Sequence, residues 1–259
     1  MTVFAHLLLN HLLRGARHTR PVTQTVAPQW DLILVLGALC DARFEPIAQA
    51  SLKILSFKTA LLLTLTSAKR VGDLCALSTQ PACLAINGDR SSAVLRPNPA
   101  FTPKIVTSSY KSRVITLDAF FLPPHPSARE DRLHRLCPVC ALACYMECTA
   151  SIRLSTQLLV CYAGTTVGRP LSAQRLSHWL CDCITLAYKT TGRIPPTGLR
   201  AHSTRGMAVS TALFQGVRVH DICTAASWSS PSSFVEFYLR DIPSGSISQS
   251  VLSVAADRT

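Results

Sequence analysis

The chain has 259 residues and a formal net charge of +12, from 26 lysines and arginines against 14 aspartates and glutamates. This length is enough to bury one substantial hydrophobic core, and the charge favours an anionic partner such as DNA, RNA or an anionic membrane surface. We expect no membrane span, because the longest apolar runs are well short of the roughly 20 residues that a bilayer requires. We also expect no secretory signal, because no basic segment precedes the apolar stretch near the N-terminus.

The cysteines favour a reduced protein without a metal. There are 11, scattered through segments with a helical pattern, which differs from the dense framework of a small disulfide-bonded domain. The tightest group is "LHRLCPVCALACYMEC", where Cys137 and Cys140 form a CxxC pair near His134. This pair could begin a zinc site, but a second compact ligand pair is missing, and Cys144 and Cys148 continue a helical repeat. We therefore favour buried free cysteines on a helix and predict no metal and no cofactor.

The first half of the chain is predicted to contain helices followed by a small sheet. Residues 29–78 are predicted to be helical, because apolar side chains recur at intervals of three and four with few breakers. Residues 91–101 and 112–120 have the pattern of short strands joined by a lysine-containing turn, which indicates a small antiparallel sheet. A Pro-rich loop is expected at residues 122–131, and a helix at residues 137–155.

The second half is predicted to be helical with one short strand. Residues 160–164, "VCYAG", are consistent with a brief buried strand, and residues 172–192 have a clear amphipathic helical pattern. Residues 199–216, 218–228 and 230–239 are each predicted to form a helix. The predicted fold class is therefore mainly α with one small antiparallel β-sheet.

The common catalytic motifs are absent, since the sequence has no Walker loop, GxGxxG, GxSxG or HExxH. What remains is a set of basic, polar and aromatic residues near predicted helix ends: Arg70, His202, Arg205, Trp228 and Tyr238. Each has a structural explanation when taken alone. Arg70 can form a local ion pair with Asp73, His202 and Arg205 can lie on a solvated helix face, and Trp228 can pack in the core.

Together these residues resemble the motifs of the tyrosine recombinase (phage integrase) family. In the family's order, the sequence carries Arg70-x-x-Asp73-Leu74, a lysine-bearing β segment, His202-x-x-Arg205-Gly206, Trp228 and Tyr238. The resemblance covers residues 30–241. It is closest to the recombinases of DIRS-like retrotransposons, whose sequences are similar around "TSAKRVGDL", "LRPNPAF", "RAHSTRG" and "ASWSSPSSFVEFY". The resemblance implies the DNA breaking-rejoining catalytic fold of that family.

The resemblance also implies a role for each residue in metal-free cleavage of a DNA strand. Arg70 and Arg205 would bind the scissile phosphate, since a guanidinium stays charged and offers a planar fork of donors. His202 would act as a base or orient the phosphate. Trp228 occupies a position that is His in many members, and its indole N–H can donate one hydrogen bond to a phosphate oxygen. Tyr238 would be the nucleophile that forms a 3′-phosphotyrosyl bond.

The family's leaving-group acid is a lysine on the β-hairpin. Lys104 is the candidate and Lys111 the alternative, because the register of the hairpin cannot be fixed from one sequence. By the same resemblance, residues 1–25 are interpreted as a remnant or linker, with the family's N-terminal core-binding domain largely missing. Residues 26–245 would form the catalytic domain and residues 246–259 a tail.

The implied biology is recombination or integration of a mobile element in the nucleus. Double-stranded DNA is the expected partner, with a homo-tetramer assembled on it and no role at a membrane. The alternative hypothesis is a catalytically inactive DNA-binding remnant of a transposon recombinase, which would keep the basic residues without turnover.

Overall fold

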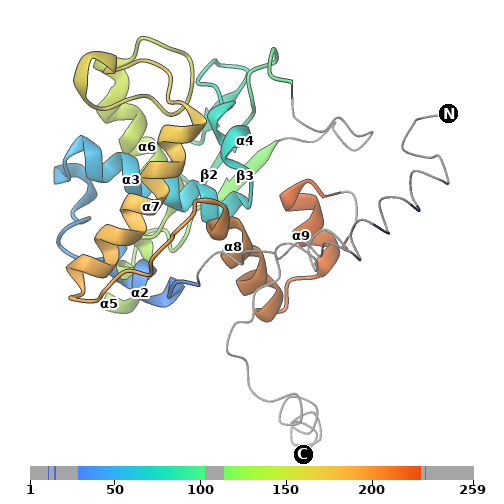
Figure 1. The fold of residues 1–259 in the computed structure, drawn as a ribbon. Coiled ribbons are helices and arrows are strands. Elements are labelled where there is room, and N and C mark those ends of the chain that lie inside the picture. Colours follow the sequence, from blue (N-terminus) through green and yellow to red (C-terminus); the bar gives the residue numbers. More distant parts are fainter. Residues whose placement is uncertain (1–10, 12–14, 16–28, 103–113, 229–230, 232–259) are drawn as a thin grey trace, which may run out of the picture.

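The computed structural model describes residues 11, 15, 29–102, 114–228 and 231 (Figure 1). The predicted site residues Lys104, Lys111 and Tyr238 lie outside them. In this part of the chain, helices pack together with one three-stranded antiparallel sheet. The predicted fold class, mainly α with a small antiparallel sheet, is therefore confirmed.

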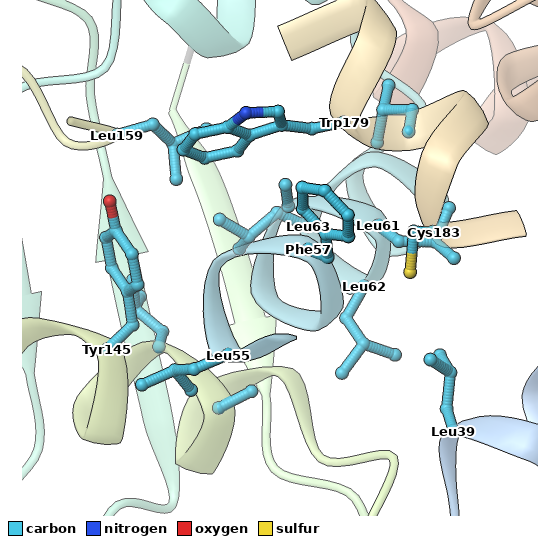
Figure 2. Packing of buried hydrophobic residues seen from close by; sticks show 14 of the residues in the cluster. Leu39, Leu55, Phe57, Leu61, Leu62, Leu63, Tyr145, Leu159, Trp179 and Cys183 are labelled. Carbon is cyan, nitrogen blue, oxygen red and sulfur yellow. The ribbon is translucent and has the colours of Figure 1, made fainter. Parts of the chain in front are cut away.

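The central element is α3 (Leu52–Ser67), which is buried along most of its length. The Ser51 side chain caps it by accepting a hydrogen bond from the N–H of Ile54. α3 packs against α6 (Pro138–Thr149) and α7 (Ala173–Thr190). Figure 2 shows Phe57 of α3 facing Trp179 of α7, with ring centroids 6.0 Å apart. Burying a side chain such as Phe57 stabilises the fold by about 1.5–3 kcal/mol. The buried side chains of α3, α6 and α7 belong to one cluster, which is the main core.

The helices predicted before and after α3 are present. α2 (Leu32–Leu39) begins after Asp31, whose side chain accepts a hydrogen bond from the N–H of Leu34. α4 (Val71–Cys75) follows α3 after a short connection. The periodicity of residues 29–78 thus predicted these three helices, but residues 40–51 form turns with a short 3-10 helix and Leu77 and Ser78 form isolated β-bridges.

The sheet has the strand order β1-β2-β3, with bounds β1 (Leu84–Ile86), β2 (Ser92–Leu95) and β3 (Ile115–Asp118). Antiparallel pairing places Ala93 opposite Leu117 and Leu95 opposite Ile115. All four of these side chains are buried, so one face of the sheet contributes to the main core. The strands β2 and β3 were predicted, whereas the three-residue β1 was not.

Two predictions for the middle of the chain were wrong in detail. α5 (Ala128–His134) begins inside the predicted Pro-rich loop, because Ser127 caps a helix by accepting a hydrogen bond from the N–H of Glu130. Residues 160–164 form no named strand. Val160 makes an isolated β-bridge with Pro170, and a 3-10 turn follows at Gly164–Thr166. The bridge is too short to build a ladder.

The last described helices form a second, smaller core. α7 is followed by α8 (His202–Phe214) and α9 (Val219–Ala226), as the periodicity predicted. Figure 1 shows α8 between the main body and α9. The second cluster of buried side chains joins the end of α3 to α8 and α9, and comprises Ala68, Val209, Ile222, Cys223, Ala226 and Trp228.

All 11 cysteines lie in the described part of the chain and are free. Their environments differ. Burial raises the pKa of the Cys183 thiol in the main core. The pKa of the Cys137 thiol is instead lowered, chiefly by a hydrogen bond with the Cys140 thiol.

Among the described residues, no helix is long and apolar enough to cross a bilayer.

A buried ion pair anchors α3 to the segment that follows α2. The Lys58 ammonium is completely buried, where it pairs with the Glu45 carboxylate and donates a hydrogen bond to the carbonyl oxygen of Leu39 at 2.7 Å. Breaking such a pair is costly because one charge stays buried alone. We therefore expect Glu45→Gln to lower the free energy of unfolding at neutral pH by about 3–5 kcal/mol, measured by urea unfolding.

The same variant should become more stable as the pH rises. Burial lowers the pKa of Lys58 from 10.5, and Glu45 opposes that shift, so the pKa should fall further in Glu45→Gln. Between the folded-state pKa and 10.5 the unfolded chain binds more protons, so stability increases with pH across this window. A Glu45→Gln, Lys58→Met double variant should lack this increase. Equal stability of Glu45→Gln and the unmodified chain at neutral pH would contradict the prediction.

Candidate active site at the junction of α3, α8 and α9

Arg70 lies in the tight connection between α3 and α4. α3 ends at Ser67, and its C-cap residue Ala68 turns the chain with a left-handed φ of 51°. Arg70 is half-buried, and its backbone N–H donates to the Asp73 carboxylate at 3.4 Å. Asp73 therefore contacts the backbone of Arg70, as a residue in the first turn of a helix does. This contact fixes the main chain from which the Arg70 side chain extends.

Arg205 joins α8 to the end of α9. It is only 2% exposed, and its Nη2 donates a hydrogen bond to the carbonyl oxygen of Ala226. Its guanidinium carbon lies 4.6 Å from the centre of the Trp228 ring, which is a cation–π arrangement. The structure thus brings together Arg205 and Trp228, two of the predicted site residues, through direct contact.

The end of α9 is also held by the α3–α4 connection. Ser227 has a left-handed φ of 55° and terminates α9, and the N–H of Trp228 donates to the Cys223 carbonyl at 2.8 Å. The Lys69 ammonium, 6% exposed, donates to Ser227 Oγ at 2.8 Å. This bond links residues 158 positions apart. It places the residue before Arg70 beside the residue before Trp228.

The small sheet reaches the same junction. A cavity of about 10 Å³, roughly the space of one water molecule, is lined by Lys69, Asp73, Leu77, Pro97, Phe101, Ile115 and Ser227. Phe101 and Ile115 flank the segment that the sequence predicts to carry the catalytic lysine. The described ends of that segment therefore lie beside Lys69 and Ser227.

His202 and Arg205 have different environments, although their spacing predicted one helix face. His202 is the first residue of α8 and is exposed, whereas Arg205 is buried one turn later. The first turn of α8 is held by Trp30, whose indole N–H donates to Ser203 Oγ at 3.0 Å. The Ser203 hydroxyl in turn donates to the Arg200 carbonyl at 2.7 Å. His202 is thus presented to solvent on an anchored helix end.

Three cationic residues and one acidic residue, Asp73, contribute to the junction. Lys69, Arg70 and Arg205 come from two segments, and the N-terminal end of α8 adds a partial positive charge from its backbone dipoles. Fixed cations of this kind stabilise an anion, above all one whose charge grows in a transition state. The chemistry that fits is binding and activation of a phosphate group.

Sequence reasoning did not identify three residues that build this junction: Lys69, Ser227 and Trp30. Lys69 could have been found as a second cation next to Arg70. Ser227 and Trp30 gave no signal, because their roles depend on partners more than 150 positions away. The predicted Tyr238, Lys104 and Lys111 lie outside the described residues.

No family model and no curated protein matches the chain. Solved structures do match. The XerA recombinase is similar with a TM-score of 0.53 and 12% identity, over 94% of this chain and 68% of that chain. The chain has the fold of a tyrosine recombinase catalytic domain. A lambda integrase tetramer bound to a Holliday junction matches with a TM-score of 0.50 and 14% identity, over 93% of this chain and 59% of that chain.

The tyrosine recombinase fold explains why distant segments meet at one junction. The chain spans about three fifths of the lambda integrase chain, 59% of its length. Within the shared fold, the end of α3, the start of α8 and the end of α9 converge, as the described contacts show.

Proposed function

We propose that this chain breaks and rejoins DNA strands, as a site-specific recombinase or integrase of a mobile element. The observation that carries the proposal is the contact of Arg205 with Trp228 beside the Lys69–Arg70 connection. These residues come from three sequence motifs and meet in a fold similar to those of XerA recombinase and lambda integrase. The order of the motifs and the geometry of the described ones thus point to the same chemistry.

In this proposal, Arg70 and Arg205 bind the scissile phosphate. During transfer of a DNA phosphoryl group, negative charge spreads over the phosphate oxygens, so fixed cations lower the barrier. Arg70 and Arg205 supply planar forks of donors that match these oxygens. Trp228 packs on the plane of the Arg205 guanidinium and sets its orientation. Lys69 adds a further positive charge while it holds Ser227.

The proposed reaction is two transesterifications. The Tyr238 oxygen attacks the scissile phosphorus, and its proton passes to His202, on the exposed first turn of α8, in the role of base. The bond from phosphorus to the 5′-oxygen breaks, and a lysine of the β2–β3 connection, Lys104 or Lys111, protonates that oxygen. A 5′-hydroxyl from another strand then attacks the phosphorus of the 3′-phosphotyrosyl bond and gives its proton back to the lysine, while the released Tyr238 oxygen takes its proton back from His202. The bond energy is conserved in the phosphotyrosine, so no external energy source is needed.

The proposal extends to partners and setting. The net charge of +12 favours a polyanionic partner, and the sequence resemblance supports double-stranded DNA, on which a homo-tetramer would exchange two pairs of strands. The sequence resemblance supports a DIRS-like retrotransposon as the source of the element and the nucleus as the place of action.

A suicide substrate tests the function. The full chain is incubated with a nicked duplex that loses the cleaved fragment, so that rejoining is prevented and a denaturation-resistant protein–DNA adduct accumulates. We expect such an adduct, together with DNA binding that weakens as salt rises. Salt-dependent binding without any adduct would instead support the inactive DNA-binding remnant. Absence of DNA binding at low salt would exclude both.

A further inference from the structure

Four side chains with metal-binding atoms lie together where the chain leaves β3 and enters α5 and α6. One ligand atom from each of His134, Cys137 and Cys140 lies within 4.8 Å of the others. The His125 ring joins this group, since its centroid is 4.8 Å from that of His134. Within the described part of the chain, the buried Nδ1 of His125 has no hydrogen-bond partner. We propose that these four residues form a structural zinc site.

His125 supplies the ligand whose absence made a zinc site unattractive from the sequence alone. The sequence shows one CxxC pair and one nearby histidine, with no second compact pair. In the structure, His125 lies shortly before α5 and His134 is the last residue of that helix, and their rings lie at an interplanar angle of 43°. The second pair is therefore His125 and His134.

The surrounding backbone is arranged as around a metal. The peptide of Phe120 donates its N–H to Cys137 Sγ at 3.4 Å, and its carbonyl oxygen lies 3.2 Å from His134 Nδ1. Metal-bound histidines commonly donate their second ring N–H to a backbone carbonyl, which fixes the tautomer. That tautomer leaves Nε2 of His134 with the lone pair for a metal. A second N–H, from Cys140, points to Cys137 Sγ at 3.5 Å.

The ligand types select zinc. Two thiolates and two imidazoles in a closed tetrahedral group are characteristic of structural zinc. Bonds of about 2.3 Å to sulfur and about 2.0 Å to nitrogen place neighbouring ligand atoms about 3.3–3.8 Å apart. The spread of up to 4.8 Å among His134, Cys137 and Cys140 requires a contraction of about 1 Å. His125, whose ring contacts that of His134, would have to turn toward the same point, and Cys140, His125 and His134 are only half-buried, which leaves their side chains room to rotate.

A metal at this site would stabilise α5, a helix that has no residue buried in the core. α5 has seven residues, none of them buried, and a helix this short is marginal without packing. His125 precedes α5 and His134 is its last residue. Cys137 is the N-cap of α6, and Cys140 lies in the first turn of that helix. Metal binding to such a group contributes directly to folding. Zinc would therefore hold the Pro-rich loop and α5 against the start of α6.

Zinc content and cobalt spectra of the full chain test this site without any DNA. We expect one zinc per chain, removable by a chelator, and cobalt substitution should give the intense visible bands of a tetrahedral site with thiolate charge transfer. His125→Ala and Cys140→Ser should each weaken binding by at least about 100-fold, since loss of an outer-shell partner alone costs about 10–100-fold. Cys148→Ser, which alters an exposed cysteine of α6, is the matched control and should bind normally.

Three results would overturn the proposal. The first is a reduced, folded chain that binds no zinc or cobalt. The second is a Cys137–Cys140 disulfide in the purified chain with no metal bound after reduction. The third is unchanged metal affinity in His125→Ala, a substitution in a half-buried loop residue that leaves the core intact even if Cys140→Ser fails to fold.

Discussion

Replacing Tyr238 by phenylalanine should eliminate the covalent protein–DNA adduct completely while DNA binding is retained. The substitution removes one oxygen atom, and that atom forms the phosphotyrosyl bond in the proposed reaction. The cationic residues that attract the phosphate, Arg70 and Arg205 among them, are unchanged. The outcome is measured with the suicide substrate on denaturing gels, alongside a salt titration of binding to the same duplex.

A second tyrosine provides the control. Tyr162 is half-buried and packs against the main core, where its ring is 5.0 Å from that of Trp179, and Tyr162→Phe removes the same atom away from the junction. This variant should form the adduct as the unmodified chain does. An adduct that persists in Tyr238→Phe would show that another residue is the nucleophile, and mass spectrometry of the DNA-linked peptide would identify it.

The helices of the fold could be predicted because their apolar faces are strongly periodic. α7 is the clearest case, since its buried residues Leu176, Leu180, Cys183 and Ile184 recur at helical spacing and face α3. Periodicity was weaker where an element is short. β1 has three residues, and its pairing with β2 depends on a neighbouring strand rather than on its own composition.

α5 shows a local signal that was outweighed by composition. Three prolines, Pro123, Pro124 and Pro126, dominate the segment and suggested a loop. Ser127 and Glu130 nevertheless have the Ser-x-x-Glu spacing of a helix start, and the structure uses the Ser127 cap. The Ser127 cap therefore predicts the helix, whereas the approach of His125 to His134 depends on the path of the loop before it.

The sequence indicated the types of residue in the candidate site but not their contacts. Arg205 was expected to bind the scissile phosphate or to lie on a solvated helix face, yet it is 2% exposed, which is rare for an arginine. Its burial depends on Ala226 and Trp228, which lie more than 20 positions later. The bond between Lys69 and Ser227 is likewise a product of tertiary structure. Neither partner has a pattern that would reveal the other.

The contacts of Arg205 give it a structural role as well as the proposed catalytic one. It connects α8 to the last turn of α9 through Ala226 and Trp228, and the segment carrying Tyr238 begins directly after Trp228. An arginine that binds the phosphate would therefore also fix the point from which the nucleophile's segment starts. Catalysis and positioning should both depend on this side chain.

Arg205→Ala should accordingly reduce the rate of adduct formation by about 10³-fold or more, the range observed when an arginine that stabilises a phosphoryl-transfer transition state is lost. Arg205→Lys keeps the charge but lacks the planar fork, so we expect a loss of about 10²-fold. The control is Arg218→Lys, at a position where the side chain is 82% exposed and paired with Asp221. Its rate should be unchanged.

Rates must be compared at saturating DNA and at a temperature where each variant is folded, as shown by its thermal unfolding curve. Loss of the cation–π contact alone should destabilise the chain by only about 0.5–2 kcal/mol, so a temperature well below the unfolding transition separates stability from catalysis.

Trp228→Phe retains a ring for Arg205 and removes the indole N–H, and it should lose less activity than Arg205→Lys. If folded Arg205→Lys forms adduct as fast as the unmodified chain, Arg205 acts only as a structural link between α8 and α9.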